Sequence, residues 1–527
     1  MTIINKILKI ELYALVGIAV LFSFQACNDA FNEHYSLDTE MRSDLNLIEY
    51  MQSRSDLGKF VELLEFTGYK DTLTHSQAYT VFALTNDALS DIEINESVAD
   101  SLRLLVANHI TGGTHVFPAI IKAFNGKYIE QQKDQGVFYY GDQKIAEPNL
   151  LTKNGVVHVM KTRVPYVMNI WEFIQNQPSL DSLRTYLNSI SKLQFSPALS
   201  YDENSVFIDS VFVASNKFLN ELGDIDDELF LSSVILPSNT AWNELYGKIF
   251  PYYRSLDKLD EDSTLITGEE QQVSLTKWSM IKDCVFGGLL EDPATKDSLR
   301  STSGSVFKNP AYLFESSVKH TLSNGHAYVT DQMKNKLTDS WLKPIIVEAE
   351  SDIYQKVVVS NCKLVTYSTF GSQFTASRNY FVRYEQLPGN DFSKVSVRFP
   401  IPNTLANVKY NIYCVFIPSN AINPDDTRPY YANFYLSYVD EEGNTITDQA
   451  LTVENKVTNP DEITKLLVAE NYQFSYCNLI SGPASEVGKD ISVYLKVENA
   501  ARTRDERNGT YSRSIAIDYI ILEPVMD

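Results

Sequence analysis

The chain has 527 residues, of which 44% are apolar, and its formal net charge at pH 7 is −22. A chain of this length and apolar content can bury several cores, so we expect roughly three or four folded domains rather than a disordered polymer. The acidic balance argues against a nucleic-acid partner, whose phosphates require a basic face, and against electrostatic adsorption to anionic lipid.

The chain begins with the layout of a targeting segment. Lys6 and Lys9 precede an apolar stretch over residues 12–24, which is too short for an ordinary membrane-spanning helix. The stretch ends in Gln-Ala-Cys at Cys27, and polar and acidic residues follow. These features resemble a bacterial lipoprotein signal peptide followed by the export signal of Bacteroidetes surface lipoproteins.

This resemblance implies a signal peptide over residues 1–26, lipidation of Cys27 and a lipidated N-terminal linker over residues 27–43. It also implies an outer-membrane protein that is exposed at the cell surface and held to the membrane by its N-terminal lipid. The alternative is an uncleaved anchor in which Cys27 is incidental.

The next part of the chain contains a repeat. Residues 79–89, Tyr-Thr-Val-Phe-Ala-Leu-Thr-Asn-Asp-Ala-Leu, return as residues 232–242, Ser-Ser-Val-Ile-Leu-Pro-Ser-Asn-Thr-Ala-Trp. Each copy is a β-rich apolar run that stops at a small polar pair, Thr85-Asn86 or Ser238-Asn239. Because Thr, Ser and Asn side-chain oxygens cap helix N-termini, each copy predicts a strand that turns into a helix.

Two further segments recur in the same order. Residues 108–113 and 154–159 follow the first copy, and residues 283–288 and 324–329 follow the second. Together these segments resemble the fasciclin (FAS1) family.

The resemblance implies an α+β FAS1 domain over residues 44–167 and a divergent FAS1 domain over residues 168–344. In the second copy Cys284 and Tyr328 stand at or near the positions of the family's histidines, and residues 252–270 form an insertion. Family histidines at the positions of His109 and His158 usually make internal hydrogen bonds, which we expect here in preference to metal binding.

Apolar residues at helical spacing open the first copy and predict an amphipathic helix pair that is broken near Gly58. Helical residues 171–174 restart the pattern in the second copy. Residues 223–228, Gly-Asp-Ile-Asp-Asp-Glu, gather hard oxygen ligands but lack the EF-hand arrangement, so a solvated acidic loop is favoured over a calcium site.

The cysteines after Cys27 are scattered, with no C-x-x-C and no metal-ligand spacing. Buried free thiols are therefore expected, with a disulfide among the last three as the alternative. They are Cys284, Cys362, Cys414 and Cys477.

From about residue 344 the sequence changes to alternating strands and turns. Val395, Val397 and Phe399 alternate with polar neighbours, and Phe434, Leu436 and Tyr438 and residues 491–497 do the same. Residues 440–444, Asp-Glu-Glu-Gly-Asn, indicate a hairpin turn. The fold class is thus multidomain: two α+β FAS1 domains, then an all-β antiparallel sandwich or jelly roll over residues 345–527.

The two ends of this last region, residues 346–350 and 515–522, resemble the first and last strands of galactose-binding-like sandwiches, which include carbohydrate-binding modules that begin with Glu-Ala-Glu. The resemblance implies a structural calcium held by Glu348, Glu350 and Asp518, whose oxygens suit a hard cation. The alternative is that these carboxylates face solvent.

Sugar binding needs exposed aromatic side chains flanked by polar groups. The candidates lie in a Ser/Thr/Gly-rich segment and after a turn-prone Pro-Asp-Asp segment; the alternative is that they pack the edge of the sandwich. They are Tyr367, Phe370, Phe374, Tyr430 and Tyr431.

The sequence has no G-x-S-x-G, H-E-x-x-H, P-loop or Rossmann glycine pattern, so we assign no catalytic residue and predict a protein that is not an enzyme and needs no cofactor beyond the calcium. Carboxylate pairs leave a polysaccharide-acting enzyme as the third option. We expect a surface lipoprotein whose sandwich binds glycan beside an outer-membrane uptake system of the SusC/SusD kind, with FAS1 domains as docking or spacer modules. The alternative is an adhesion or assembly protein whose FAS1 domains bind a protein partner.

Overall fold

The computed structural model describes residues 43–75, 77–202, 205–260, 263–351, 357–358, 362–387, 389, 393–479 and 492–526. The predicted signal peptide, Cys27 and nearly all of the predicted linker lie outside these ranges. None of the helices within them is long and apolar enough to cross a membrane. The chain divides into two units, which we treat separately. One runs up to Phe173 and includes residues 225–230 and 322–324, and the other holds the remaining residues.

The first domain opens with short helices, which are α2 (Leu47–Gln52), α3 (Gly58–Phe66), α4 (Tyr69–Thr74) and, further along, α5 (Ala99–Ala107). The predicted break near Gly58 is confirmed. Helix α2 begins with a capping box: Asn46 Oδ1 accepts the N–H of Glu49 at 2.9 Å, and the Glu49 carboxylate accepts the N–H of Asn46 at 2.9 Å. Leu47, Phe60 and Leu64 of these helices are fully buried in the core.

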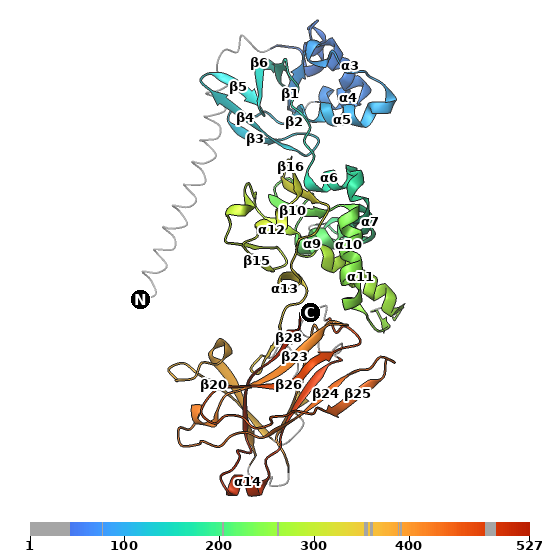
Figure 1. Ribbon diagram of the computed structural model, residues 1–527. Coiled ribbons are helices and arrows are strands. Elements are labelled where there is room, and N and C mark those ends of the chain that lie inside the picture. Colours follow the sequence, from blue (N-terminus) through green and yellow to red (C-terminus); the bar gives the residue numbers. More distant parts are fainter. Residues whose placement is uncertain are drawn as a thin grey trace, which may run out of the picture. The chain divides into compact units, whose positions relative to one another are not determined.

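The strands of this domain form a mostly antiparallel sheet in the order β2-β1-β7-β6-β5-β4-β3 (Figure 1). β1 and β7 run parallel, with Tyr79 opposite Gly155. All of β1 is buried, and the Phe82 ring stacks on Tyr140 with centroids 3.6 Å apart. The strands are β1 (Tyr79–Leu84), β2 (Ile110–Gly112), β3 (Ala119–Lys122), β4 (Tyr128–Asp134), β5 (Val137–Tyr140), β6 (Gln143–Thr152) and β7 (Gly155–Met160).

The second repeat forms a sheet with the same central arrangement, in the order β13-β10-β17-β16. Its β10 and β17 run parallel, with Ser232 opposite Gly325, as Tyr79 lies opposite Gly155 in the first copy. The strands are β10 (Ser232–Pro237), β13 (Val285–Gly287), β16 (Ser317–Leu322) and β17 (Gly325–Thr330). The helices are α6 (Ile170–Asn176), α7 (Asp181–Ser189), α9 (Lys217–Leu222), α10 (Asn239–Ile249), α11 (Gly268–Ile281), α12 (Ala311–Phe314) and α13 (Leu337–Ser340).

The polar pair after β1 caps a single 3-10 turn and not the predicted helix, with Thr85 Oγ1 accepting the N–H of Ala88 at 3.4 Å. Only a short 3-10 turn, η2 (Asp87–Leu89), follows, and the Asn86 side chain makes no capping hydrogen bond. Instead Asn86 Oδ1 accepts the N–H of Lys59 at 2.9 Å, and its Nδ2 donates to the carbonyl of Ser55 at 2.9 Å. The asparagine therefore fastens the strand end to the start of α3.

The corresponding pair after β10 makes the same two kinds of contact and begins a full helix. Ser238 caps α10 by accepting the N–H of Ala241 at 3.4 Å, as predicted. Asn239 Oδ1 accepts the N–H of Ser182 at 2.8 Å, and its Nδ2 donates to the carbonyl of Pro178 at 3.1 Å. The two repeats thus share the asparagine contact and differ in the helix that follows.

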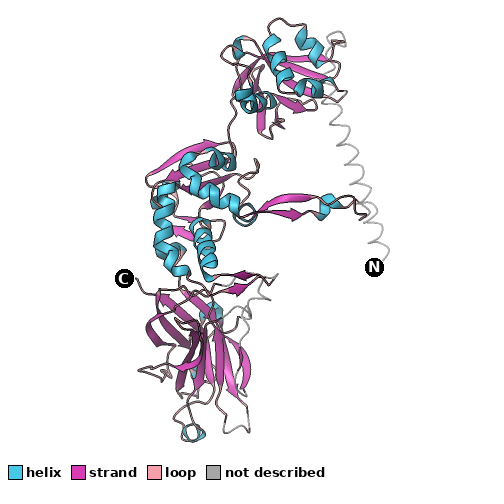
Figure 2. Cartoon of the chain, turned by 90° about the vertical axis from the view of Figure 1, so that its right-hand side faces the viewer, coloured by secondary structure: helices cyan, strands magenta, loops and turns pink. Residues whose placement is uncertain are grey.

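Two insertions interrupt the second repeat. A hairpin of β8 (Ser191–Phe195) and β9 (Phe212–Asn216), with helix α8 (Pro197–Ser200) near its far end, projects from the helices of its own unit (Figure 2). The predicted insertion over residues 252–270 comprises the end of η5 (Phe250–Tyr253), the strands β11 (Lys258–Leu259) and β12 (Leu265–Ile266), and the start of α11.

The last region consists of two antiparallel sheets. The first has the order β20-β21-β28-β23-β26, with β18 also paired to β28, and the second has the order β19-β22-β27-β24-β25. The strands of the first are β18 (Ile345–Glu348), β20 (Cys362–Ser368), β21 (Tyr380–Gln386), β23 (Lys409–Phe416), β26 (Thr464–Gln473) and β28 (Ile515–Pro524). Those of the second are β19 (Val357–Val358), β22 (Ser396–Pro400), β24 (Ala432–Val439), β25 (Thr445–Ala450) and β27 (Tyr494–Asn499).

Ring contacts join the buried faces of these sheets. Tyr384 of β21 lies 6.2 Å from Phe399 of β22, and Phe416 of β23 lies 6.4 Å from Phe434 of β24, measured between ring centroids. Val395, Val397 and Phe399 are fully buried, as the alternation predicts. The extensive β structure expected after the two repeats is therefore present.

One predicted buried face is wrong at its end. Phe434 and Leu436 are buried, but a register shift between Leu436 and Tyr438 turns the strand, so that Ser437 and Val439 are buried and Tyr438 is half-exposed. The turn after β24 is confirmed, because Asp440 and Asn444 pair through a backbone hydrogen bond of 3.0 Å.

Candidate functional site

The histidines of the first repeat are structural. His109 Nδ1 donates to the carbonyl of Leu105 at 2.8 Å, and its Nε2 accepts the N–H of Val164 at 3.1 Å. His158 Nδ1 accepts the N–H of Asn149 at 3.0 Å. Burial lowers the pKa of His109 to about 4 and that of His158 to about 3, so both rings are neutral at pH 7. The expectation of internal hydrogen bonds is confirmed.

The second repeat replaces both histidines by groups that also bond to the backbone. Cys284 Sγ donates to the carbonyl of Met280 at 3.4 Å, four residues earlier, just as His109 bonds four residues back. The Tyr328 hydroxyl donates to the carbonyl of Leu290. These motif positions therefore stabilise the fold and offer no reactive group to a ligand.

Asn154 and Asn324, which begin the third shared segment of each repeat, have matching roles. Asn154 Oδ1 accepts the N–H of Leu47 at 2.8 Å, and Asn324 Oδ1 accepts the N–H of Ile170 at 2.9 Å. Each side-chain amide also donates to backbone carbonyls. Each asparagine directly precedes β7 or β17 and joins the start of that strand to the first helix of its repeat.

The acidic segment 223–228 is not simply solvated. Glu228 is largely buried and pairs with Lys127 Nζ at 2.5 Å, and Glu172 pairs with the same ammonium at 2.6 Å. Asn169 Nδ2 donates to Glu228 Oε1 at 3.1 Å. The prediction of a solvated loop is wrong for Glu228, because the buried Lys127 needs carboxylate partners.

The carboxylates nominated for calcium lie where β18 meets β28. The N–H of Ala349 donates to the carbonyl of Asp518 at 2.8 Å, which holds the two strands in register. Ser377 touches two of the nominated carboxylates: its N–H donates to Asp518 Oδ1 and Oδ2 at 3.1 and 3.0 Å, and its Oγ donates to Glu348 Oε1 at 2.7 Å. Glu348 and Asp518 are buried and Glu350 is half-buried, so the alternative in which all three simply face solvent does not hold.

These carboxylates repel one another. Burial, together with the negative charges of Glu348 and Glu350, raises the pKa of Asp518 to about 7, against the lowering effect of the Ser377 N–H. Glu348 keeps a buried Oε2 with no hydrogen-bond partner in the described part of the chain, although the exposed Arg378 lies 3.5 Å from its other oxygen. Within the described ranges, no group of three or more His, Cys, Asp or Glu side chains is arranged as a metal site. The donor chemistry suits a hard cation such as Ca²⁺.

An exposed aromatic pair lies in the segment that leads to Ser377. Phe370 is 69% exposed, and its ring contacts Tyr380 edge-on with centroids 6.0 Å apart; Tyr380 is 41% exposed. Tyr367 is half-buried and stacks on Phe381 with centroids 5.6 Å apart. Tyr380 was not predicted, although it opens a strand whose next residue points inward, which would have indicated an outward side chain.

The other nominated aromatics do not form a surface of this kind. Tyr430 is 1% exposed, and its ring packs on Phe416 with centroids 6.1 Å apart. Phe374 is also buried. The prediction of sugar-binding surfaces is wrong for both, because each fills the core between the sheets or beneath a loop. Tyr431 is half-buried and contacts Tyr511 at 5.3 Å, away from Phe370 in the strand order.

Each of the four described cysteines is a free thiol, so no disulfide joins Cys362, Cys414 and Cys477. Cys284 and Cys414 are buried, and burial raises the pKa of both thiols. Low thiolate content makes such groups poor nucleophiles.

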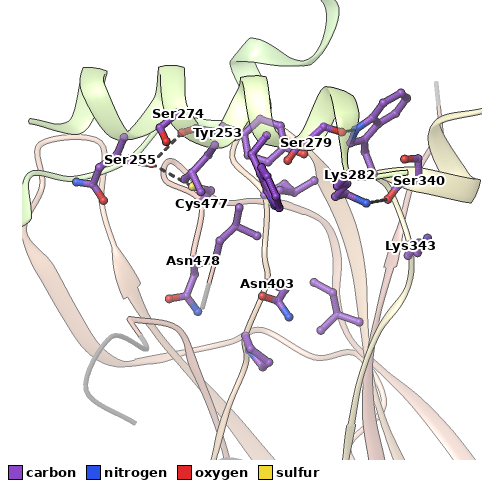
Figure 3. A pocket seen from close by; sticks show the side chains of 18 of the residues that line it. Tyr253, Ser255, Ser274, Ser279, Lys282, Ser340, Lys343, Asn403, Cys477 and Asn478 are labelled. Atoms are coloured by element: carbon purple, nitrogen blue, oxygen red, sulfur yellow. Dashed lines mark hydrogen bonds between the residues drawn. The ribbon is translucent and has the colours of Figure 1, made fainter. Parts of the chain in front are cut away.

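The structure also contains a cavity that the sequence did not predict. It has a volume of about 1150 Å³ and lies entirely within the second unit, between helix α11 and loops of the two-sheet region. Figure 3 shows Ser274, Ser279 and Lys282 on the helix side and Asn403 and Asn478 on the facing loops.

The 252–270 insertion holds the walls of this cavity together. The N–H of Ala406 donates to the carbonyl of Tyr252 at 2.9 Å, and the N–H of Cys477 donates to the carbonyl of Arg254 at 2.7 Å. The Arg254 guanidinium lies 4.6 Å from the centroid of the Tyr476 ring. The insertion was visible in the sequence, but its contact with residues more than a hundred positions away was not.

Comparison with known proteins gives one family match. The fasciclin domain model matches residues 55–163. Domains of this class are generally non-catalytic.

Three solved structures are similar to parts of the chain. A FAS1 domain pair from the insect cell adhesion molecule Fasciclin I covers 54% of this chain and 98% of its own, at 11% identity and a TM-score of 0.20. A family 35 carbohydrate binding module from Clostridium thermocellum covers 34% of this chain and 97% of its own, at 13% identity and a TM-score of 0.17. A CocE/NonD family hydrolase from Staphylococcus aureus covers 35% of this chain and 36% of its own, at 11% identity and a TM-score of 0.14.

These structural likenesses are too distant to bear on function. The family match is different in kind, since the matched residues include β1, β2 and β7 and the histidines and asparagines that fasten them. The chain therefore contains a fasciclin domain in residues 55–163.

Proposed function

We propose that the chain is a non-catalytic surface lipoprotein of Bacteroidetes type that binds glycan through a β-sandwich at residues 345–527. In this proposal residues 1–26 are removed, Cys27 carries the lipid, and the protein assists an outer-membrane glycan-uptake system of the SusC/SusD kind. The fasciclin domain and its repeat serve as docking or spacer modules.

The second repeat is proposed to be a divergent FAS1 domain. Support comes from the parallel pair β10 and β17, which has the register of β1 and β7. Further support comes from Asn239 and Asn324, whose hydrogen bonds correspond to those of Asn86 and Asn154. Matching buried polar contacts at matching positions are unexpected in unrelated folds, because an unsatisfied buried amide is costly.

The observation that carries glycan binding is the exposed pair of Phe370 and Tyr380. Sugars present apolar C–H faces between hydroxyl groups, so they pack on exposed rings and bond to polar neighbours. Ser368 and Ser372 lie beside Phe370 and supply hydroxyls. Large exposed aromatic groups are otherwise unfavourable in water.

A structural calcium at Glu348, Glu350 and Asp518 belongs to the same proposal. A bound cation would remove the mutual repulsion of these carboxylates and supply a partner for Glu348 Oε2. Because Ser377 bonds to both Glu348 and Asp518, calcium binding would also steady the segment that carries Phe370.

Affinity electrophoresis of the full chain against a polysaccharide panel, with calcium or with chelator, tests the proposal. We expect retardation on at least one glycan, lost in Phe370→Ala/Tyr380→Ala and retained in the matched control Tyr128→Ala, which removes an exposed tyrosine from the first domain. Equal retardation of the wild type, the double variant and the control, or no retardation on any glycan, would refute glycan binding at this surface.

Calcium is tested separately by thermal unfolding. Calcium is expected to raise the melting temperature of the wild type and of Asp461→Asn, which alters an exposed carboxylate, but not that of Asp518→Asn. An equal rise in Asp518→Asn would place the cation elsewhere.

The second candidate function is adhesion or assembly through a protein partner, and the β8–β9 hairpin favours it. Leu193 and Phe212 are 75% and 55% exposed. The register places Leu193 opposite Ala214 and Phe195 opposite Phe212, so one face of the hairpin is apolar, whereas Lys192 lies on the other. An isolated two-stranded hairpin is only marginally stable in water, and a partner would cover its apolar face.

Cells that carry variant chains separate the two functions. Leu193→Ser/Phe212→Ser is expected to reduce attachment with growth on glycans unchanged if adhesion is the function, and Lys192→Ser serves as the control. Normal attachment with both serine substitutions would exclude the hairpin from adhesion.

A further inference from the structure

The cavity beside α11 is basic at one end. Lys282 and Lys343 line it there, and the only carboxylate that bonds either of them in the described structure is Asp283, which is buried behind the wall. Lys282 Nζ lies 2.6 Å from Asp283 Oδ2, and Lys343 Nζ donates to Ser305 Oγ at 2.7 Å. Asp283 thus pairs with Lys282, whereas Lys343 has no carboxylate within ion-pair distance among the described residues.

The pKa values describe the same imbalance. Burial lowers the pKa of Lys343, and the positive charge of Lys282 lowers it as well, while the negative charges of Asp283 and Asp339 oppose the shift. Burial alone would raise the pKa of Asp283, but the charge of Lys282 and the hydrogen bonds from Lys282, Ser303 and Ser305 together lower it, so this carboxyl stays ionised. An anion in the cavity would give the Lys343 ammonium an ion-pair partner.

The carboxylates at the other end of the cavity are engaged by the helix. Asp257 Oδ1 accepts the N–H of Gly268 at 2.7 Å, and Glu270 accepts the N–H of Thr267 at 2.8 Å in the capping box of α11. These negative charges stabilise the helix N-terminus. The third lining carboxylate, Glu221, lies one turn from Lys217 on α9.

The rest of the wall suits a saccharide. Trp278 of α11 is half-buried and lies under the Lys217 ammonium, which is 4.3 Å from its ring. A volume of about 1150 Å³ is at the upper end for small-molecule sites and accommodates a short oligosaccharide rather than one ring. Hydroxyl groups are abundant among the lining residues, which include Ser255, Ser274, Ser279, Ser303, Ser305 and Ser340.

We propose that this cavity binds an acidic oligosaccharide, with a carboxylate or sulfate group at Lys282 and Lys343 and a sugar face against the Trp278 side of the wall. The proposal rests on glycan recognition as the proposed function, but it places a second site away from Phe370 and Tyr380. Basic groups concentrated in one cavity of a chain with charge −22 select for a ligand that the rest of the surface repels.

The test is calorimetry of the full chain with oligogalacturonate, a sulfated chondroitin oligosaccharide and a neutral galactan oligosaccharide of equal length. We expect one of the two acidic ligands to bind at least about tenfold more tightly than the neutral one, the scale of one charge-assisted hydrogen bond. Lys343→Met should remove that difference, Lys343→Arg should keep most of it, and the uronate and sulfate arms identify the acidic group.

Lys343 is chosen because Lys282 neutralises the buried Asp283, so its loss would unfold the wall. Melting temperatures check that both Lys343 variants fold. Equal affinity for acidic and neutral sugars, or no effect of Lys343→Met, overturns the proposal. Equal binding of a glutamate pentapeptide also overturns it, because the site would then recognise charge without sugar.

The two proposals fail in different ways. Acidic binding that is lost in Lys343→Met and kept in Phe370→Ala/Tyr380→Ala supports the cavity and removes the aromatic surface from glycan recognition. Binding lost only in Phe370→Ala/Tyr380→Ala supports the aromatic surface and overturns the cavity.

Discussion

Acidification should unfold the fasciclin domain through its buried histidines, and His158→Gln should weaken this response. The pKa values of His109 and His158 are lowered from 6.5 to about 4 and about 3. At mildly acidic pH both rings therefore bind a proton in the unfolded chain but stay neutral in the folded chain. Their contribution to stability is complete above pH 6.5 and is lost as the pH falls towards 4. Lowering the pH from 7.5 to 5 reduces the free energy of unfolding by about 2 kcal/mol for each histidine, and therefore by about 4 kcal/mol for the pair.

Hydrogen exchange followed by mass spectrometry measures this loss of stability on the full chain, because it reports the exchange of β1 and β7 separately from that of the second unit. After correction for intrinsic exchange rates, the opening free energy of β1 should fall by about 4 kcal/mol in the wild type and about 2 kcal/mol in His158→Gln. The glutamine can still accept the N–H of Asn149, so the fold survives. The control His75→Gln alters an exposed histidine and should respond like the wild type. Equal falls in all three proteins would refute the reasoning.

Three further substitutions have definite expected outcomes. Asn154→Ala leaves the N–H of Leu47 and two carbonyls unpaired and should lower the opening free energy of β7 by about 2 to 4 kcal/mol in the same exchange experiment; an unchanged value would contradict the role of this asparagine. Lys127→Met leaves two carboxylates without their ammonium and should destabilise residues 169–173 by about 3 to 5 kcal/mol, with recovery when Glu228→Gln is added; no recovery would show that packing matters more than charge. Tyr430→Ala should open a core cavity and cost about 3 to 5 kcal/mol in urea unfolding, and a neutral result would mean that the ring is not buried in solution.

Local patterns predicted several elements of the first repeat. The strand β1, the break before α3 and the buried histidines follow from short segments whose hydrogen bonds close within the same domain. The Asn86 contact was missed because its partners, Ser55 and Lys59, lie about thirty residues away in sequence. A capping residue and a cross-linking residue look the same in a sequence, since both use the same side-chain oxygen.

The aromatic candidates show that sequence patterns did not predict which side chains are buried. Phe370 lies in a Ser/Thr/Gly-rich segment and Tyr430 follows a turn-prone one, yet Tyr430 fills the core and Phe370 is exposed. Alternation could not place Tyr438 either, because a register shift in β24 reverses the inward face after Leu436. Which face of a strand is buried depends on the partner sheet, and a single strand does not encode its partner.

The amino-acid sequence alone determined the repeat, the fasciclin domain, the β-rich last region and the acidic character, because each is written in contiguous residues or in overall composition. Only the tertiary structure decided that Ser377 joins Glu348 to Asp518, that Phe370 meets Tyr380, and that Lys282 and Lys343 line the same cavity. Such sites combine residues from distant segments, and their chemistry arises from distance and burial, which the order of residues does not specify.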